Sequence, residues 1–420
     1  MKKGIIKTKM KKNIELLAPA GSFEKAKIAF LYGADCVYAG TQDLSLRTRT
    51  EMTNEELKKT IDYAHSIGKK VNVAMNIYAM DESYEAIKEQ AKILNEMKVD
   101  GIIVSDGGVV EIVKEYAPDI PIHISTQANT VSYHTCEFWK KNGAKRVILG
   151  RELNKEQIRE IMKNKPDDLE IEIFGHGAIC FGYSGRCFLS EYLAGRNANL
   201  GDCAQSCRWA FNLYVEETNN PGNLMPVETD NKGTYIFSSK DLCLIKEIPD
   251  IIDMGIDSVK IEGRLKTEYY LATVINCYRN AIDDYQKDPE NFDYTKFLKE
   301  LEKTKTRGLT TFYFNDRDNQ DIQDYSGRQY NAEYEFAGKV INQMEEEKTL
   351  IEIRNKLSLD DELELIIPGK IEPLVFKIEQ LWNDETLEEI DTVNPGRAEQ
   401  KVILKVPYSV EKGWILRRKK

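Results

Sequence analysis

The first 175 residues alternate short β-branched hydrophobic runs with amphipathic stretches of helical period. Ser22, Thr53 and Asn154 stand directly before such stretches, and Glu56 completes a capping box with Thr53. The predicted strands are residues 14–18, 36–39, 71–75, 101–104, 122–125, 146–149 and 169–174, with 258–262 as the eighth. Strands and helices alternating at this spacing form right-handed βαβ units, so the pattern favours an α/β protein with a TIM-like (β/α)8 barrel.

The rest of the chain departs from this pattern in two places. A cysteine-rich insertion follows the seventh strand at about 177–240, and we assign to it a further strand-like run at 235–238. From about residue 333 the hydrophobic period becomes two, which indicates a small antiparallel β-barrel. Its predicted strands are 335–340, 349–354, 362–367, 372–378 and 401–406. We therefore expect a TIM-like domain at 1–330 and a small β-barrel at 331–420, with separate cores.

Composition and charge narrow the function classes. The chain has 420 residues, of which 41% are hydrophobic and 30% charged, as in ordinary soluble proteins. No apolar run reaches the roughly 18 residues that span a bilayer, and the lysine-rich start precedes a segment too short and charged for export, so we expect a cytoplasmic protein. The net charge of −10 means that any nucleic-acid site must be local. The basic segment 417–420 is either a candidate RNA-binding segment or simply a solvated end of the chain.

Five of the eight cysteines fall between positions 180 and 243. Four of them follow the spacing C-x6-C-x15-C-x3-C, from Cys180 to Cys207. Thiolates grouped in fours hold either zinc or an iron–sulfur cluster, and buried free thiols are the plainer alternative. The wide first gap fits zinc less well, but spacing alone leaves both metals open.

Polar residues follow several of the predicted strands at the end where barrel enzymes carry out their chemistry. They are Asn76, Gln127, Arg151, His176, Lys260, Glu262 and Arg264. Together with Arg47 and Arg49, the arginines suit an anionic ligand at the barrel mouth. Any one of these side chains can instead cap a helix or anchor a loop.

The string from Glu172 to Ser190 resembles the signature of the collagenase-like, U-thirty-two peptidase family. Residues 15–21, 33–40 and 258–264 resemble other strands of that family, so the resemblance covers essentially the whole chain. The branch that the run from Gly201 to Arg208 resembles includes prephenate-dependent tRNA hydroxylases that make 5-hydroxyuridine at the wobble position. The resemblance implies a 4Fe–4S cluster, with zinc as the alternative. Its implied ligands are Cys180, Cys187, Cys203 and Cys207, with Cys243 in reserve.

The resemblance and the strand ends together lead to a set of expected roles. The catalytic candidates are Gln127, His176, Lys260 and Glu262, and the substrate-binding candidates are Arg47, Arg49, Asn76, Arg151 and Arg264. The expected partners are tRNA, a small dicarboxylate such as prephenate, and a second copy or a related family member in an oligomer. Two alternatives stay open, a collagenase-like peptidase and a non-catalytic iron–sulfur partner protein. No H-E-x-x-H or G-x-S-x-G motif supports the peptidase.

Overall fold

The computed structural model describes most of the chain. The described residues are 13–41, 44–45, 51–180, 187–209, 214–216, 218–219, 221–222, 224–226, 239–304, 306–315, 322, 333–344, 347–396 and 399–420. Arg47, Arg49 and the strand expected at 235–238 lie outside them. No helix in these ranges is long and apolar enough to cross a membrane.

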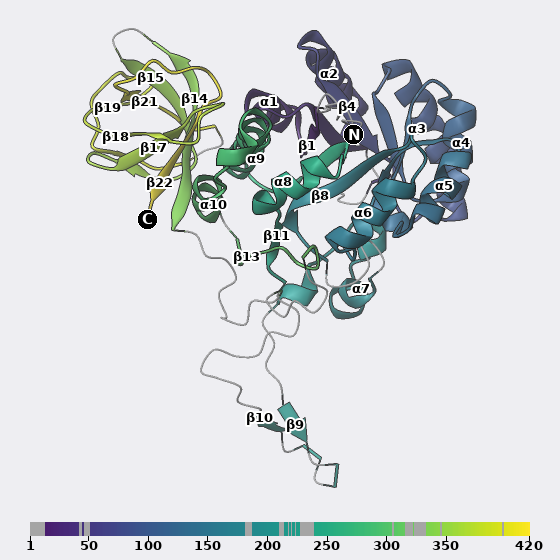
Figure 1. The fold of residues 1–420 in the computed structure, drawn as a ribbon. Helices are drawn as coiled ribbons and strands as arrows, with labels where there is room; N and C mark the ends of the chain where they lie inside the picture. The colour runs from purple at the N-terminus through teal and green to yellow at the C-terminus, as the bar shows by residue number, and fades with distance from the viewer. Residues whose placement is uncertain are drawn as a thin grey trace, which may run out of the picture.

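Eight parallel strands form a closed barrel, which confirms the predicted TIM-like fold (Figure 1). They are β1 (Glu15–Pro19), β2 (Cys36–Thr41), β4 (Lys70–Ala74), β5 (Gly101–Val104), β6 (Ile122–Ile124), β7 (Ala144–Ile148), β8 (Glu170–Ala178) and β12 (Ser258–Ile261). Strand β12 pairs with both β1 and β8 and so closes the ring. A two-residue strand, β3 (Glu51–Met52), extends the edge of β2.

Helices cover the outside of the barrel. They are α1 (Phe23–Leu31), α2 (Asn54–Ser66), α3 (Tyr84–Met97), α4 (Gly107–Tyr116), α5 (Tyr133–Lys141), α6 (Lys155–Asn164), α8 (Ile248–Asp253) and α9 (Glu268–Lys287). Three predicted caps are formed, because the side chains of Ser22, Thr53 and Asn154 accept backbone N–H bonds at the starts of α1, α2 and α6. Helix α9 is followed by the shorter α10 (Thr295–Glu302).

The insertion leaves the barrel from an extended β8. Strand β11 (Asp241–Cys243) pairs antiparallel with the last residues of β8, and β13 (Leu309–Thr310) adds to β11. The described parts of the insertion are α7 (Leu189–Ala194), the 3-10 turns η4 (Ala198–Leu200) and η5 (Ser206–Arg208), and the hairpin β9 (Tyr214–Glu216) with β10 (Leu224–Pro226). The insertion therefore starts and ends at the carboxyl end of β8.

The C-terminal region forms a seven-stranded antiparallel sheet with its own hydrophobic core. Its order is β18 (Leu374–Lys377), β17 (Glu362–Ile366), β22 (Ile415–Lys419), β14 (Tyr334–Gln343), β15 (Lys348–Ile353), β21 (Lys401–Lys405) and β19 (Leu381–Trp382). The pair β16 (Leu357–Ser358) and β20 (Thr392–Val393) lies beside it. The predicted small antiparallel β-domain is confirmed, as a curled sheet in which β18 and β19 do not pair among the described residues.

The basic C-terminal segment is not a solvated tail. It forms β22, which pairs with both β14 and β17 in the middle of the sheet. Arg417 is fully buried and forms ion pairs with Glu300 and Glu364. Arg418 pairs with Glu335 and Asp361. Two of the four basic residues that were proposed to bind RNA therefore form ion pairs within the fold.

The two domains also share a buried interface. The Tyr32 hydroxyl donates to the carbonyl of Ile366 at 2.8 Å and accepts from the backbone N–H of Ile415 at 3.0 Å. Ile366 and Ile415 belong to the hydrophobic core of the large barrel. The small domain thus has a core of its own and also contributes residues to the core of the large barrel. The two cores are therefore less separate than the change of hydrophobic period near residue 333 suggested.

Candidate active site

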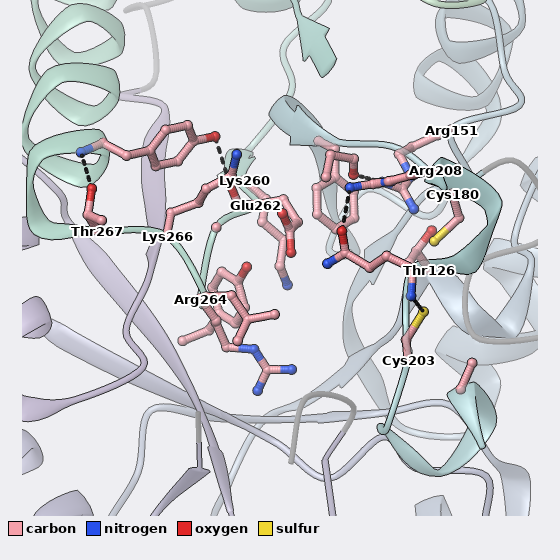
Figure 2. A pocket seen from close by; sticks show the side chains of 18 of the residues that line it. Thr126, Arg151, Cys180, Cys203, Arg208, Lys260, Glu262, Arg264, Lys266 and Thr267 are labelled. Atoms are coloured by element: carbon pink, nitrogen blue, oxygen red, sulfur yellow. Dashed lines mark hydrogen bonds between the residues drawn. The ribbon is translucent and has the colours of Figure 1, made fainter. Parts of the chain in front are cut away.

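A cavity of about 950 Å³ opens at the carboxyl ends of the barrel strands. Figure 2 shows Lys260, Glu262 and Arg264 on one side and Arg151, Arg208, Cys180 and Cys203 on the other. Among the residues that the structure describes, six lysines and arginines line it against two glutamates. They are Arg151, Arg208, Lys260, Arg264, Lys266 and Lys420, with Glu262 and Glu335. The cavity therefore suits an anionic ligand, although the whole chain is acidic.

Lys260 stands on the floor of this cavity at the end of β12. Its Nζ lies 3.3 Å from Oε1 of the fully buried Glu172 and 4.2 Å from the centre of the Tyr38 ring. Burial lowers the pKa of Lys260, and the charge of Glu172 opposes that shift. Glu172 is in turn held by Arg146, whose Nη1 lies 3.0 Å from Oε2. A buried chain of charges thus fixes one ammonium group at the site.

Two predicted arginines flank this lysine. The Arg151 guanidinium lies 4.8 Å from the Phe174 ring centre and donates to the carbonyl of Ala178 at 3.0 Å. Arg264 is buried and donates to Ser45 Oγ at 3.3 Å. A Cβ at Gly40 would collide with the Arg264 guanidinium, so only glycine leaves room for it there. Each arginine is therefore held by its own partners, and both guanidinium groups line the same cavity.

Two amides lie at the neighbouring strand ends, as predicted. Asn76 Nδ2 donates to Gln127 Oε1 at 2.6 Å, and the Ser125 hydroxyl donates to the same oxygen at 3.2 Å. Both amides line the cavity, as does Glu262. Amides offer a donor and an acceptor, which is what the edge of a nucleobase requires.

All four cysteines of the predicted ligand set line this same cavity. Cys180 follows β8, Cys187 precedes α7, and Cys203 and Cys207 lie around η5. The backbone N–H of Gln205 donates to Cys203 Sγ at 3.3 Å. Burial raises the pKa of the Cys207 thiol, Arg208 lowers it, and the three other thiols raise it further. The four thiols are therefore near enough to affect one another's charge.

The four thiols are candidate ligands of an iron–sulfur cluster or of a zinc ion. Among the described residues, no three His, Cys, Asp or Glu side chains converge closely enough to hold one metal ion. A zinc ion draws all four sulfurs to about 2.3 Å from one centre, whereas in a four-iron cluster each cysteine binds a different iron.

Two predicted residues lie elsewhere. His176 does not line the cavity, because a β-bulge between the pairs Phe174–Lys260 and His176–Ile261 breaks the alternation of β8. His176 is thereby turned outward against Tyr278 and is buried, which lowers its pKa to about 4. Cys243 is also buried outside the cavity, 3.9 Å from the Tyr278 hydroxyl. Its reserve role as a ligand finds no geometric support.

Some residues that line the cavity were not among the predicted site residues. Arg208 reaches it directly after the ligand candidate Cys207, where its guanidinium donates to the carbonyl of Ile179 at 3.1 Å. Lys266 lies 5.0 Å from the Tyr270 ring centre, two residues beyond the predicted Arg264. Because Arg208 and Lys266 lie close in sequence to predicted site residues, the sequence could have indicated them. Arg47 and Arg49 lie outside the described residues, so their predicted role stays a prediction.

Comparison with known proteins adds to this geometry. The profile of Peptidase family U32 matches residues 21–324, and that of the Peptidase family U32 C-terminal domain matches residues 332–417. The chain belongs to Peptidase family U32. Among its relatives in this family, a Bacillus subtilis (strain 168) protein named "tRNA hydroxylation protein P1" is 40% identical over 383 residues, 90% of this chain and 89% of that protein.

Two Escherichia coli (strain K12) relatives carry names that refer to RNA. One, named "tRNA hydroxylation protein P", is 37% identical over 442 residues and covers 96% of each chain. The other, named "23S rRNA 5-hydroxycytidine C2501 synthase", is 32% identical over 311 residues, 72% of this chain and 46% of its own. Similarity to the first thus extends through both domains.

Proposed function

We propose that this protein is an RNA-modifying enzyme that hydroxylates tRNA, converting the wobble uridine to 5-hydroxyuridine with prephenate as co-substrate. The names of its relatives support RNA hydroxylation. The observation that carries the proposal for this chain is the cation-rich cavity at the barrel mouth, which brings lysine, arginine, amide and thiol groups together. A base must leave its stack before chemistry can reach it, and this cavity has the size of a small-molecule site.

Each part of the cavity wall has a role in this proposal. Lys260, Arg151 and Arg264 bind the carboxylates of the small acid, because guanidinium and ammonium groups pair with them directly. Gln127 and Asn76 hydrogen-bond the edge of the flipped uracil. The rings of Tyr38 and Phe174 supply flat surfaces beside Lys260. Glu262 lies near enough to the same space to hold or accept a proton.

Cys180, Cys187, Cys203 and Cys207 would hold a 4Fe–4S cluster in this proposal. When bound, such a cluster supplies an electron-transfer centre and cross-links the insertion to the end of β8. The residues around it already order the loop, since Arg196 pairs with Asp202 at 2.6 Å and the Cys187 N–H donates to Asn199 Oδ1 at 2.9 Å.

The peptidase alternative is less well supported by the cavity. All four histidines of the chain are described, and none of them lines it. A Cys–His or Ser–His nucleophile pair therefore does not form there.

The test is mass spectrometry of nucleosides from total tRNA of a strain lacking this protein. We expect 5-hydroxyuridine and its derivatives to disappear, and the intact gene to restore them. Complementation with Lys260→Ala should fail while the variant protein accumulates normally. Unchanged 5-hydroxyuridine in the deletion strain would contradict the proposal.

A further inference from the structure

A second cavity, of about 1090 Å³, lies between α1 and the small domain. Figure 1 shows that domain beside α1 and α9, on the side of the barrel away from α3 to α5. The two cavities share five lining residues, namely Leu265, Lys266, Thr267, Phe336 and Asn355. We call this second cavity the interdomain groove. It therefore begins where the active-site cavity ends.

The groove is positively charged in an acidic protein. In the described part of the chain, seven lysines and arginines line it against four glutamates. Some of these charges hold the domains together, because Glu268 of α9 pairs with Lys339 at 2.9 Å and with Arg354 at 3.3 Å. Lys401 and Lys412 lie on the small domain, where Lys401 is partly exposed and Lys412 exposed. The groove therefore contains solvent-accessible cations as well as cations that are held in ion pairs.

The ridge between the two cavities combines two apolar side chains, Leu265 and Phe336, with Lys266, Thr267 and Asn355. Leu265 is 47% exposed on this ridge. The half-buried Phe336 ring lies beside it, stacked on Tyr269 with the ring centres 6.2 Å apart. An exposed leucine and an aromatic ring suit the face of a base or ribose next to a flipped nucleotide.

The groove also has a fixed shape. Gly413 lies in the turn before β22 with a φ of +92°, and a Cβ there would collide with Leu31 of α1. The small domain therefore packs closely against α1 at this turn, and the positive φ favours glycine there.

We infer that the interdomain groove binds the phosphate backbone of the RNA strand on one side of the flipped base. This rests on the proposed function, since the groove leads away from the cavity that receives the base. Lys401 and Lys412 contact phosphates there, and Leu265 with Phe336 separates the flipped nucleotide from its neighbour. The basic segment 417–420 was the predicted grip, but Arg417 and Arg418 are committed to ion pairs.

The experiment compares two double variants of the full-length protein. Lys401→Gln/Lys412→Gln removes two groove charges, and Lys370→Gln/Lys377→Gln removes two exposed charges of the same domain that line neither cavity. Filter retention of a tRNA transcript is measured between about 50 and 200 mM salt. Thermal stabilisation by prephenate, whose proposed ligands Arg151, Lys260 and Arg264 do not line the groove, is measured on the same samples.

We expect the groove variant to bind tRNA about tenfold more weakly at low salt. The slope of log K against the logarithm of the salt concentration should be shallower by about 1.4, because two phosphate contacts are lost. The matched control should bind like wild type, and all three proteins should respond equally to prephenate. If wild type and groove variant bind tRNA alike, the inference is overturned while the proposed function stands. If wild type itself does not bind tRNA, the proposed function fails and the inference fails with it.

Discussion

Lys260 Nζ and Glu172 Oε1 lie 3.3 Å apart at the floor of the barrel, with Glu172 fully buried and Lys260 at the cavity surface. The pairing follows from register, because Lys260 of β12 and Glu172 of β8 point inward from adjacent parallel strands. Behind them Arg146 contacts Glu172 and Glu170, so the lysine is the outermost member of a buried chain of charges. Because Lys260 lies at the cavity surface next to Glu172, its pKa reports on the electrostatics of the site.

The first prediction concerns that titration. Glu172→Gln removes the charge that favours the ammonium form, so the pKa of Lys260, already below 10.5 through burial, should fall further. The variant should also lose about 3 kcal/mol of unfolding free energy, because two cations lose a buried partner. Nuclear magnetic resonance of reductively ¹³C-methylated protein, assigned with Lys260→Arg, follows the titration.

Glu170→Gln is the matched control for this prediction. Glu170 contacts Arg146 at 2.8 Å but has no ion pair with Lys260, so the lysine should titrate as in wild type. A Lys260 midpoint that is the same in Glu172→Gln and Glu170→Gln would show that the ion pair does not govern the site.

The second prediction concerns the cysteines. Protein purified without oxygen should be brown and contain about four irons per chain, and Cys187→Ser should lose both colour and iron. Cys243→Ser should keep them, because Cys243 is buried outside the cavity. Iron analysis and visible absorption test both variants. A colourless anaerobic preparation with one zinc per chain would contradict the cluster.

The third prediction concerns the arginines of the cavity. Prephenate should raise the melting temperature of the wild type, since a ligand that binds only the folded state stabilises it by about 2.7 kcal/mol at a hundred times Kd. Arg151→Ala and Arg264→Ala should each abolish that shift while the visible spectrum persists. Arg159→Ala, on the outer face of α6, is the control and should respond like wild type. A full response in both cavity variants would show that prephenate binds elsewhere.

The fourth prediction concerns pH. Burial lowers the pKa of His176 from 6.5 to about 4, so between these values the unfolded chain binds a proton that the folded chain does not. Stability should therefore fall as pH falls through that window, and this side chain should account for about 2 kcal/mol between pH 7 and pH 5. Urea unfolding of wild type and His176→Gln measures the difference. The variant should lose less stability on acidification, and identical pH profiles would refute the burial effect.

Much of the fold could be predicted because its signals are local. The β-branched runs and the caps at Ser22, Thr53 and Asn154 lie next to the elements that they define. Closure of the barrel makes the carboxyl ends of the strands converge, so Asn76, Gln127, Lys260 and Arg264 could be expected together without any contact being known. Residues adjacent to these, such as Lys266, were within reach of the same argument.

The errors arose where a long-range contact decides the outcome. Period two along β8 places His176 on the same face as Glu172, but a bulge opposite β12 reverses it. The run 417–420 has the composition of a solvated end, yet Arg417 is buried because Glu300 and Glu364, distant in sequence, meet it there.

The sequence by itself determined the eight βα units, the group of four thiols and the polar strand ends, because hydrophobic period and residue chemistry are properties of neighbouring residues. Only the tertiary structure decided which way His176 points, that Cys243 lies apart, and that a groove runs from the active-site cavity between the domains. The physical reason is that register, domain docking and burial depend on pairs of residues far apart in the chain. Gly413 against Leu31 is such a pair, and no local pattern records it.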